Sequence, residues 1–303
     1  MSPLDRRDFI RAGGAVMLGI LAACGREETP QPVTGTIDDI LDGRQPSAQL
    51  IAAGTELIEE RAERVAFGVI DPSTNQPITE AKTRLWVARD RQTAALGPFE
   101  TEYHGDGLGN RGVYVAQITF PAKGTYLLLS ETTTADGAVK LAFSPGLDVG
   151  VRNAMPKIGD QAIRVETPTV DAARGVDPIC SADPPCSLHE VSLLDALRDE
   201  KPIVLIFATP AFCQSRLCGP EVEIVESIAR DRGDDAIFIH AEVFRDDADE
   251  TIRRAIQAPA TAAWRVVEEP ATYYIDRAGR ILDRQLGPID RTDVRRATDA
   301  LLA

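Results

Sequence analysis

Two patterns of apolar residues divide the chain into parts of different character. From Leu50 to Val151 the apolar residues come in short alternating runs, separated by turn formers. Alternation with period two buries one face of a strand, and regularly spaced strands without helical stretches are typical of antiparallel sandwiches. We therefore predict an all-β sandwich over residues 49–152, with strands at Val65–Ile70, Thr83–Ala88, Val113–Phe120, Thr125–Thr132 and Val139–Phe143.

The remaining residues, 153–303, alternate between strand and helix patterns. The segment Pro202–Thr209 is a continuous apolar run, as expected of a strand buried on both faces, and Ala236–Val243 is a second. Residues spaced three and four apart are apolar in several other segments, which indicates helices. The predicted order is a helix from Ser192 to near Asp199, strand 202–209, helix Glu221–Arg230, strand 236–243, helix Glu250–Gln257, strands Tyr273–Asp276 and Arg280–Gln285, and helix Asp290–Leu302. This order predicts an α/β domain.

The N-terminus has the features of an export signal. Arg6-Arg7 is followed by the bulky pair Phe9-Ile10, an uncharged apolar run and the segment 21–24 (Leu-Ala-Ala-Cys). The run is too short to span a bilayer, which needs about 20 apolar residues. The pattern resembles a twin-arginine (Tat) signal peptide ending in a lipoprotein cleavage site. The resemblance implies that residues 1–23 are removed and that Cys24 carries a lipid.

The composition of the chain bears on its location and on its possible partners. Residues 24–48 are rich in Pro, Thr, Gly and Asp without sustained periodicity, and we predict a flexible tether there. The chain is 44% hydrophobic and 26% charged, as in globular proteins, and its formal net charge is −14. An acidic surface repels phosphate backbones, so nucleic acid is excluded as a partner. Membrane attachment is expected through the lipid on Cys24, in an extracytoplasmic location.

Besides Cys24, four cysteines form two close pairs. An even number of cysteines at short spacing in an exported protein predicts two disulfides, and local pairing costs the least chain entropy. We predict that Cys180 and Cys186 form a structural loop disulfide. His189 follows this pair, but four ligands at zinc-finger spacing are lacking, so no metal and no cofactor is expected.

The second pair, Cys213 and Cys218, carries the candidate chemistry. Cys213 follows a buried strand and precedes a helix, where backbone N–H groups stabilise a thiolate. Together with the later segment 268–279, in which Pro270 precedes a strand, this motif resembles thioredoxin-like oxidoreductases over residues 155–303. The resemblance implies Cys213 as attacking sulfur, Cys218 as its resolving partner and Pro270 as a cis proline beside them. Its implied partners are thiols and disulfides of exported proteins.

The cysteine spacing departs from that family, which has two residues between its cysteines where this chain has four. Five positions apart on a regular helix, Cys213 and Cys218 would have Cα atoms about 8.6 Å apart. A disulfide needs them within about 7 Å. Either the helix starts late, near Gly219-Pro220, or it starts at Cys213 and unwinds on oxidation.

Three other functions remain alternatives. The motif is similar to that of bacterioferritin-comigratory-type peroxiredoxins, although Thr209 is displaced by one position and the expected arginine is replaced at Glu268-Glu269. Copper handling, as in Sco-type chaperones, would use Cys213, Cys218 and His240 as soft ligands. In the third alternative the domain is a non-catalytic interaction module with structural disulfides.

The β-rich part has a resemblance of its own. Segments 112–116 (Gly-Val-Tyr-Val-Ala) and 123–127 (Lys-Gly-Thr-Tyr-Leu) are similar to paired strands of bacterial immunoglobulin-like domains. The resemblance implies an immunoglobulin-like sandwich that serves as a spacer or a docking surface.

Overall fold

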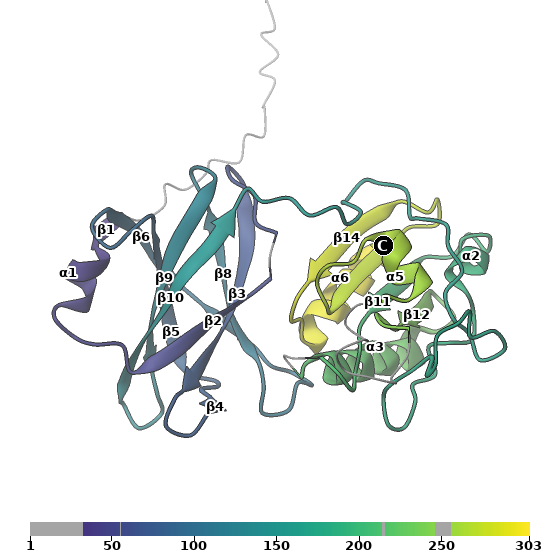
Figure 1. Ribbon diagram of the computed structural model, residues 1–303, viewed down its shortest axis with the longest axis horizontal. Coiled ribbons are helices and arrows are strands. Elements are labelled where there is room, and N and C mark those ends of the chain that lie inside the picture. Colours follow the sequence, from purple (N-terminus) through teal and green to yellow (C-terminus); the bar gives the residue numbers. More distant parts are fainter. Residues whose placement is uncertain (1–32, 55, 214–215, 246–255) are drawn as a thin grey trace, which may run out of the picture. The chain divides into compact units, whose positions relative to one another are not determined.

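The computed structural model describes residues 33–303 except 55, 214–215 and 246–255 (Figure 1). By its contacts the chain divides into residues 1–30 and residues 31–303, and only the second unit is described. The predicted signal peptide, Cys24 and the first part of the predicted tether therefore lie outside the described residues. So does most of the predicted helix Glu250–Gln257.

The first half of the described chain is all-β apart from one short helix. Its elements are β1 (Val33–Thr36), α1 (Ile37–Leu41), β2 (Ala48–Ala53), β3 (Ala62–Asp71), β4 (Gln76–Pro77), β5 (Lys82–Ala88), β6 (Ala94–Glu100), β7 (Glu102–His104), β8 (Val113–Thr119), β9 (Gly124–Thr133) and β10 (Val139–Val149). They form one large sheet in the order β1-β6-β5-β9-β10-β2-β3-β8-β7, and β4 pairs with β3. The five predicted strands are confirmed.

This sheet encloses its own core. Alternate residues of strands that lie far apart in the sheet order meet in one apolar cluster, among them Phe67 of β3, Leu85 of β5, Tyr114 of β8 and Leu128 of β9. Strands from both halves of the sheet can share a core only if the sheet folds over on itself, as Figure 1 shows. Because every second residue of these strands is buried, the alternation of apolar and polar residues predicted them from the sequence.

Residues 33–48 differ from the predicted tether. β1 pairs with β6, and α1 begins with a capping box in which Thr36 and Asp39 exchange hydrogen bonds. Ile37 and Leu41 are buried against a second cluster that includes Trp86. The segment is too short to show a period, but two apolar residues four positions apart suffice to fix one helical turn on the sheet.

The second half of the described chain contains α2 (Leu193–Ala196), β11 (Ile203–Phe207), α3 (Cys218–Arg232), β12 (Ile237–Ala241), α5 (Pro259–Trp264), β13 (Ala271–Ile275), β14 (Ile281–Leu286) and α6 (Arg291–Leu302). Its four-stranded sheet has the order β12-β11-β13-β14. β12 is parallel to β11, whereas β13 and β14 run antiparallel to their neighbours. This is the mixed α/β architecture that the element order predicted.

Helices cover both faces of this sheet. Val204 and Ile206 of β11 pack in one cluster with α3 and α6, while Ile203, Leu205 and Phe207 pack in another with α2 and α5. All five residues of β11 are buried, as predicted for a strand with two covered faces. β11 is therefore the central support of the loop that follows it.

A helix that was not predicted from the sequence precedes β13. Its described position is Pro259–Trp264, with Pro259 at the start, where a missing N–H costs nothing. Trp264 at its end is fully buried. Within the described chain, no helix is both long and apolar enough to cross a membrane.

Candidate functional site

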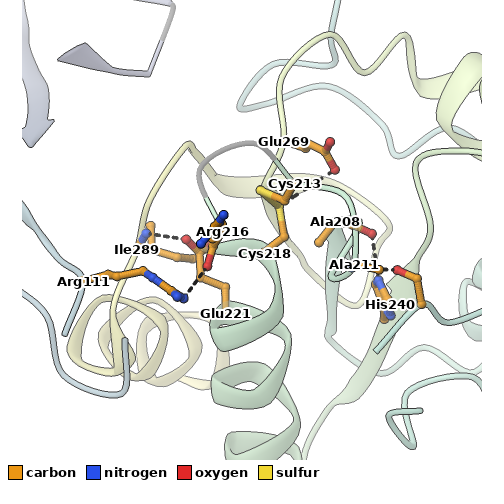
Figure 2. Close-up of a disulfide and its surroundings, with 11 residues drawn as sticks. Arg111, Ala208, Ala211, Cys213, Arg216, Cys218, Glu221, His240, Glu269 and Ile289 are labelled. Carbon is orange, nitrogen blue, oxygen red and sulfur yellow. Dashed lines mark hydrogen bonds between the residues drawn. A yellow bond between two sulfur atoms is a disulfide. The ribbon is translucent and has the colours of Figure 1, made fainter. Parts of the chain in front are cut away.

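The loop that leaves β11 carries the two cysteines of the predicted redox pair. The backbone N–H groups of Phe212 and Cys213 donate to the Thr209 carbonyl at 3.2 and 3.1 Å, which closes a turn directly after the strand. Cys213 and Cys218 form a disulfide with their Cα atoms 5.9 Å apart (Figure 2). The structure therefore contains the covalent pair that the sequence predicted.

The start of α3 explains how four intervening residues are compatible with this bond. α3 begins at Cys218, and Gly219 and Pro220 occupy its first turn. Cys213 lies in the preceding loop, so the two residues do not share a regular helix and their Cα distance is shorter than the roughly 8.6 Å of that arrangement. Of the two arrangements considered, the structure has the late helix start.

The two sulfurs differ in exposure and in electrostatic surroundings. Cys213 is 8% exposed, whereas Cys218 has no exposed surface. Cys218 rather than Cys213 occupies the first position of α3, where the unpaired N–H groups and the helix dipole favour a negative charge. Only Cys213 can meet an external sulfur, and the buried Cys218 is the better placed to hold a thiolate after the bond breaks.

An acid lies beside the disulfide that sequence reasoning had not placed there. Glu269 Oε2 is 3.9 Å from Cys218 Sγ. Burial raises the pKa of Glu269 to about 7, against the opposing effect of hydrogen bonding by Thr209. Glu242 raises this pKa further, and His240 lowers it. The position of Glu269 directly before Pro270 was the signal available in the sequence.

Pro270 precedes β13, as the sequence predicted. The Glu269–Pro270 peptide bond is cis, and the next residue, Ala271, pairs with Phe207 at the end of β11. The segment 269–270 therefore begins β13 at the same end of the sheet where the loop of Cys213 begins. The disulfide, Glu269 and Pro270 form one site, which is called the disulfide site below.

The raised pKa of Glu269 predicts how stability depends on pH. The Glu269 carboxyl is neutral in the folded protein below about pH 7, but in the unfolded protein it ionises near pH 4.5. Its contribution to the free energy of unfolding is therefore complete below pH 4.5 and is lost as the pH rises through 7. The free energy of unfolding falls by about 3 kcal/mol over this pH range. Glu269→Gln should flatten the difference in unfolding free energy between pH 5 and 8, measured by urea unfolding of the oxidised protein.

Glu223→Gln, which changes an exposed glutamate of α3, is the matched control and should follow the wild-type curve. A Glu269→Gln protein whose pH dependence equals that of the wild type would contradict the assignment of the buried neutral carboxyl.

The other predicted cysteine pair differs from the prediction. Cys180 and Cys186 are free thiols with their sulfurs 3.6 Å apart, so the structure does not contain the predicted loop disulfide. Two histidines, His189 and His240, approach these sulfurs. The side chains that could hold a metal thus converge at this pair, although no metal was expected.

His240 is therefore not placed to bind copper together with Cys213 and Cys218. Its Nδ1 lies 3.4 Å from Cys186 Sγ and 3.8 Å from Cys180 Sγ, and its Nε2 lies 2.9 Å from the Ala208 carbonyl oxygen (Figure 2). Among the described residues, no group of potential metal ligands includes Cys213 or Cys218.

Comparisons with known proteins find similar solved structures for about half of the chain. No family model matches, and no curated protein matches. Several solved structures are similar to it. One is a thiol:disulfide interchange protein of the thioredoxin family from Chlorobium tepidum TLS, at 13% identity and a TM-score of 0.33, covering 49% of this chain and 99% of that one. Another is a DsbH oxidoreductase, at 14% identity and a TM-score of 0.24, covering 50% and 94%.

Proposed function

We propose that this chain is an extracytoplasmic thiol–disulfide oxidoreductase that acts on exported proteins. The observation that carries the proposal is the disulfide between a partly exposed Cys213 and a sealed Cys218, at the end of a buried strand and beside Glu269 and Pro270. Because Cys213 retains slight exposure and Cys218 has none, a client sulfur can bond to Cys213 while Cys218 Sγ acts as the leaving group. Phe212, 37% exposed next to Cys213, offers apolar surface to an unfolded client.

The reaction follows from this asymmetry. A client thiolate attacks Cys213 Sγ, the Cys213–Cys218 bond breaks, and its electron pair leaves on Cys218 Sγ. A second client thiolate then attacks the client sulfur of the mixed disulfide and releases Cys213 as a thiolate. The client is oxidised by two electrons and the protein is reduced by two. The same steps in reverse reduce a client disulfide.

Glu269 supplies the proton that this exchange requires. At neutral pH its carboxyl is partly protonated, and it lies 3.9 Å from the sulfur that leaves. It can therefore protonate Cys218 after the bond breaks and take the proton back when Cys218 attacks the mixed disulfide. The N-terminus of α3 favours the same thiolate before the proton arrives.

Two observations make the alternative activities less favourable. A peroxidase stabilises its thiolate with a positive charge, whereas a carboxyl, Glu269, lies near this disulfide. Copper handling at Cys213 and Cys218 would need His240, whose ring nitrogens contact other groups. A measurement of the redox potential of the Cys213–Cys218 disulfide distinguishes the non-catalytic interpretation from the proposed activity.

The test is a redox titration of the full chain in glutathione buffers, with each cysteine followed by mass spectrometry of alkylated peptides. An exchange protein should have a Cys213–Cys218 potential well above about −300 mV, and reduced Cys213 should be alkylated much faster than Cys218. A potential below that value with slow exchange would show that the bond is structural. Rapid sulfenic acid formation on Cys213 by hydrogen peroxide would instead establish a peroxidase.

The location and the first half of the chain complete the proposal. A lipid on Cys24 would hold the protein at the outer face of the cytoplasmic membrane after Tat export, and two acyl chains anchor stably. The large β-sheet part would then be an immunoglobulin-like spacer between the membrane and the disulfide site. Metabolic labelling with a palmitate analogue, lost on Cys24→Ser, tests the anchor.

A further inference from the structure

Four potential metal ligands meet at one buried point outside the disulfide site. They are Cys180, Cys186, His189 and His240, and their ligand atoms all lie within 4.8 Å of one another. His189 and His240 are 2% and 0% exposed, and Cys180 is 4% exposed. The first three ligands come from the segment before α2, and His240 comes from β12.

The spacing of these atoms matches a tetrahedral ion. Zinc bonds of about 2.3 Å to sulfur and 2.0–2.1 Å to nitrogen place two sulfurs about 3.8 Å apart, a sulfur and a nitrogen about 3.6 Å, and two nitrogens about 3.3 Å. The two sulfurs here are 3.6 Å apart, and His189 Nε2 is 3.2 Å from His240 Nδ1. The sulfur–nitrogen distances are 3.4 Å for Cys186 to each histidine and 3.8 Å for Cys180 to His240.

The surroundings orient the ligands for a cation. His240 Nε2 lies 2.9 Å from the Ala208 carbonyl oxygen, so it carries the proton and leaves the Nδ1 lone pair directed at the cluster. The backbone N–H of Cys186 donates to Cys180 Sγ at 3.3 Å, which stabilises a thiolate there. Two thiolates and a divalent ion give a site with no net charge, which is the cheapest to bury.

A disulfide would not account for this arrangement. It would join the sulfurs and leave the two buried imidazoles, whose facing nitrogens are 3.2 Å apart, with one N–H···N hydrogen bond between them and no account of why both rings face the sulfurs. An ion held by all four atoms satisfies both nitrogens and both sulfurs at once. Two thiolates and two imidazoles form a closed set of the structural zinc type.

We propose that Cys180, Cys186, His189 and His240 bind one zinc ion. The site fastens the segment 180–189 to the end of β12. Ser181 of that segment accepts a hydrogen bond from the Ala211 N–H at 3.2 Å through its Oγ, and its own N–H donates to Glu242 at 2.5 Å. Zinc therefore supports the segment that contacts the loop of Cys213, without taking part in thiol exchange.

The test measures metal in the full chain purified under reducing conditions. We expect one zinc per chain by elemental analysis. Replacement by Co²⁺ should produce the visible ligand-field bands and thiolate charge-transfer absorption of a tetrahedral two-sulfur, two-nitrogen site. X-ray absorption at the zinc edge of the unaltered protein should show two sulfur and two nitrogen ligands, so the result does not depend on any variant folding.

Variants separate this site from the disulfide site. Cys186→Ser and His240→Asn should each weaken zinc affinity by more than about 100-fold, whereas the Cys213→Ser/Cys218→Ser double variant should still bind one zinc. Removing zinc with a chelator should raise amide hydrogen exchange over residues 180–189. Substoichiometric zinc, oxygen and nitrogen ligands only, copper(I) binding to the exclusion of zinc, or a Cys180–Cys186 disulfide in the exported protein would each overturn the proposal.

Discussion

A Cys213→Ser protein is expected to lose client oxidation completely, to the rate of the buffer alone. The variant cannot form the disulfide that takes up the client's electrons, and the other sulfur of this pair, Cys218, has no exposed surface. A serine hydroxyl cannot form a disulfide with Cys218, so the client thiolate has no S–S bond at this site to attack. The rate of disulfide formation in a fluorescent dithiol peptide, added to excess oxidised protein, measures the loss.

The Cys218→Ser protein gives the informative contrast. It also fails to oxidise the peptide, but its Cys213, which is slightly exposed, can attack a disulfide-containing client and, without a resolving thiol, should accumulate as a mixed disulfide visible by mass. Ala263→Ser, on an exposed position of α5, is the control and should keep the wild-type rate. Trapping through Cys218 in the Cys213→Ser protein would reverse the assigned roles.

A Trp264→Ala protein is expected to lose about 3–5 kcal/mol of unfolding free energy. Trp264 is fully buried on the sheet face opposite α3, with its ring 4.7 Å from Tyr273 and 5.5 Å from Phe207, and its indole N–H donates to the Ile163 carbonyl at 3.2 Å. Alanine leaves a cavity and an unpaired carbonyl under β11. Urea unfolding followed by far-ultraviolet circular dichroism measures the loss.

Val267→Ala is the matched control for this loss. Val267 is 70% exposed and three positions away in the chain, so the change should stay within about 0.5 kcal/mol of the wild type. A loss below about 1 kcal/mol for Trp264→Ala would show that the α5 contact does not support the central sheet.

The strands were predictable where burial follows a simple period. β3, β5, β8, β9 and β10 each bury alternate residues in the sheet's own core, and β11 buries every residue between two helical layers. Each pattern is a local consequence of one or two covered faces. Several elements were not predicted, among them the short α1 and β1. α1 and β1 occupy nine residues together and are held by contacts with β6 and Trp86, which no local pattern displays.

The disulfide site was partly predictable for the same reason. Cys213 and Pro270 each lie at the end of a recognisable strand, and adjacent strands bring their ends together. Glu269 was present in the same motif, but its raised pKa depends on burial beside Thr209 and the disulfide. The start of α3 at Cys218 depends on the turn at Thr209, and the sequence left two positions open.

The sequence by itself determined the two classes of structure along the chain, because the period of apolar residues is a property of neighbouring residues, and it favoured the pairing of Cys213 with Cys218 by their close spacing. Only the tertiary structure decided which side chains surround Cys180 and Cys186. Their spacing favours a loop disulfide, and His240 follows Cys186 by 54 positions, so no local motif connects them. The parallel pairing of β12 with β11 brings this histidine to the two sulfurs, and that convergence turns a predicted disulfide into a set of four metal ligands.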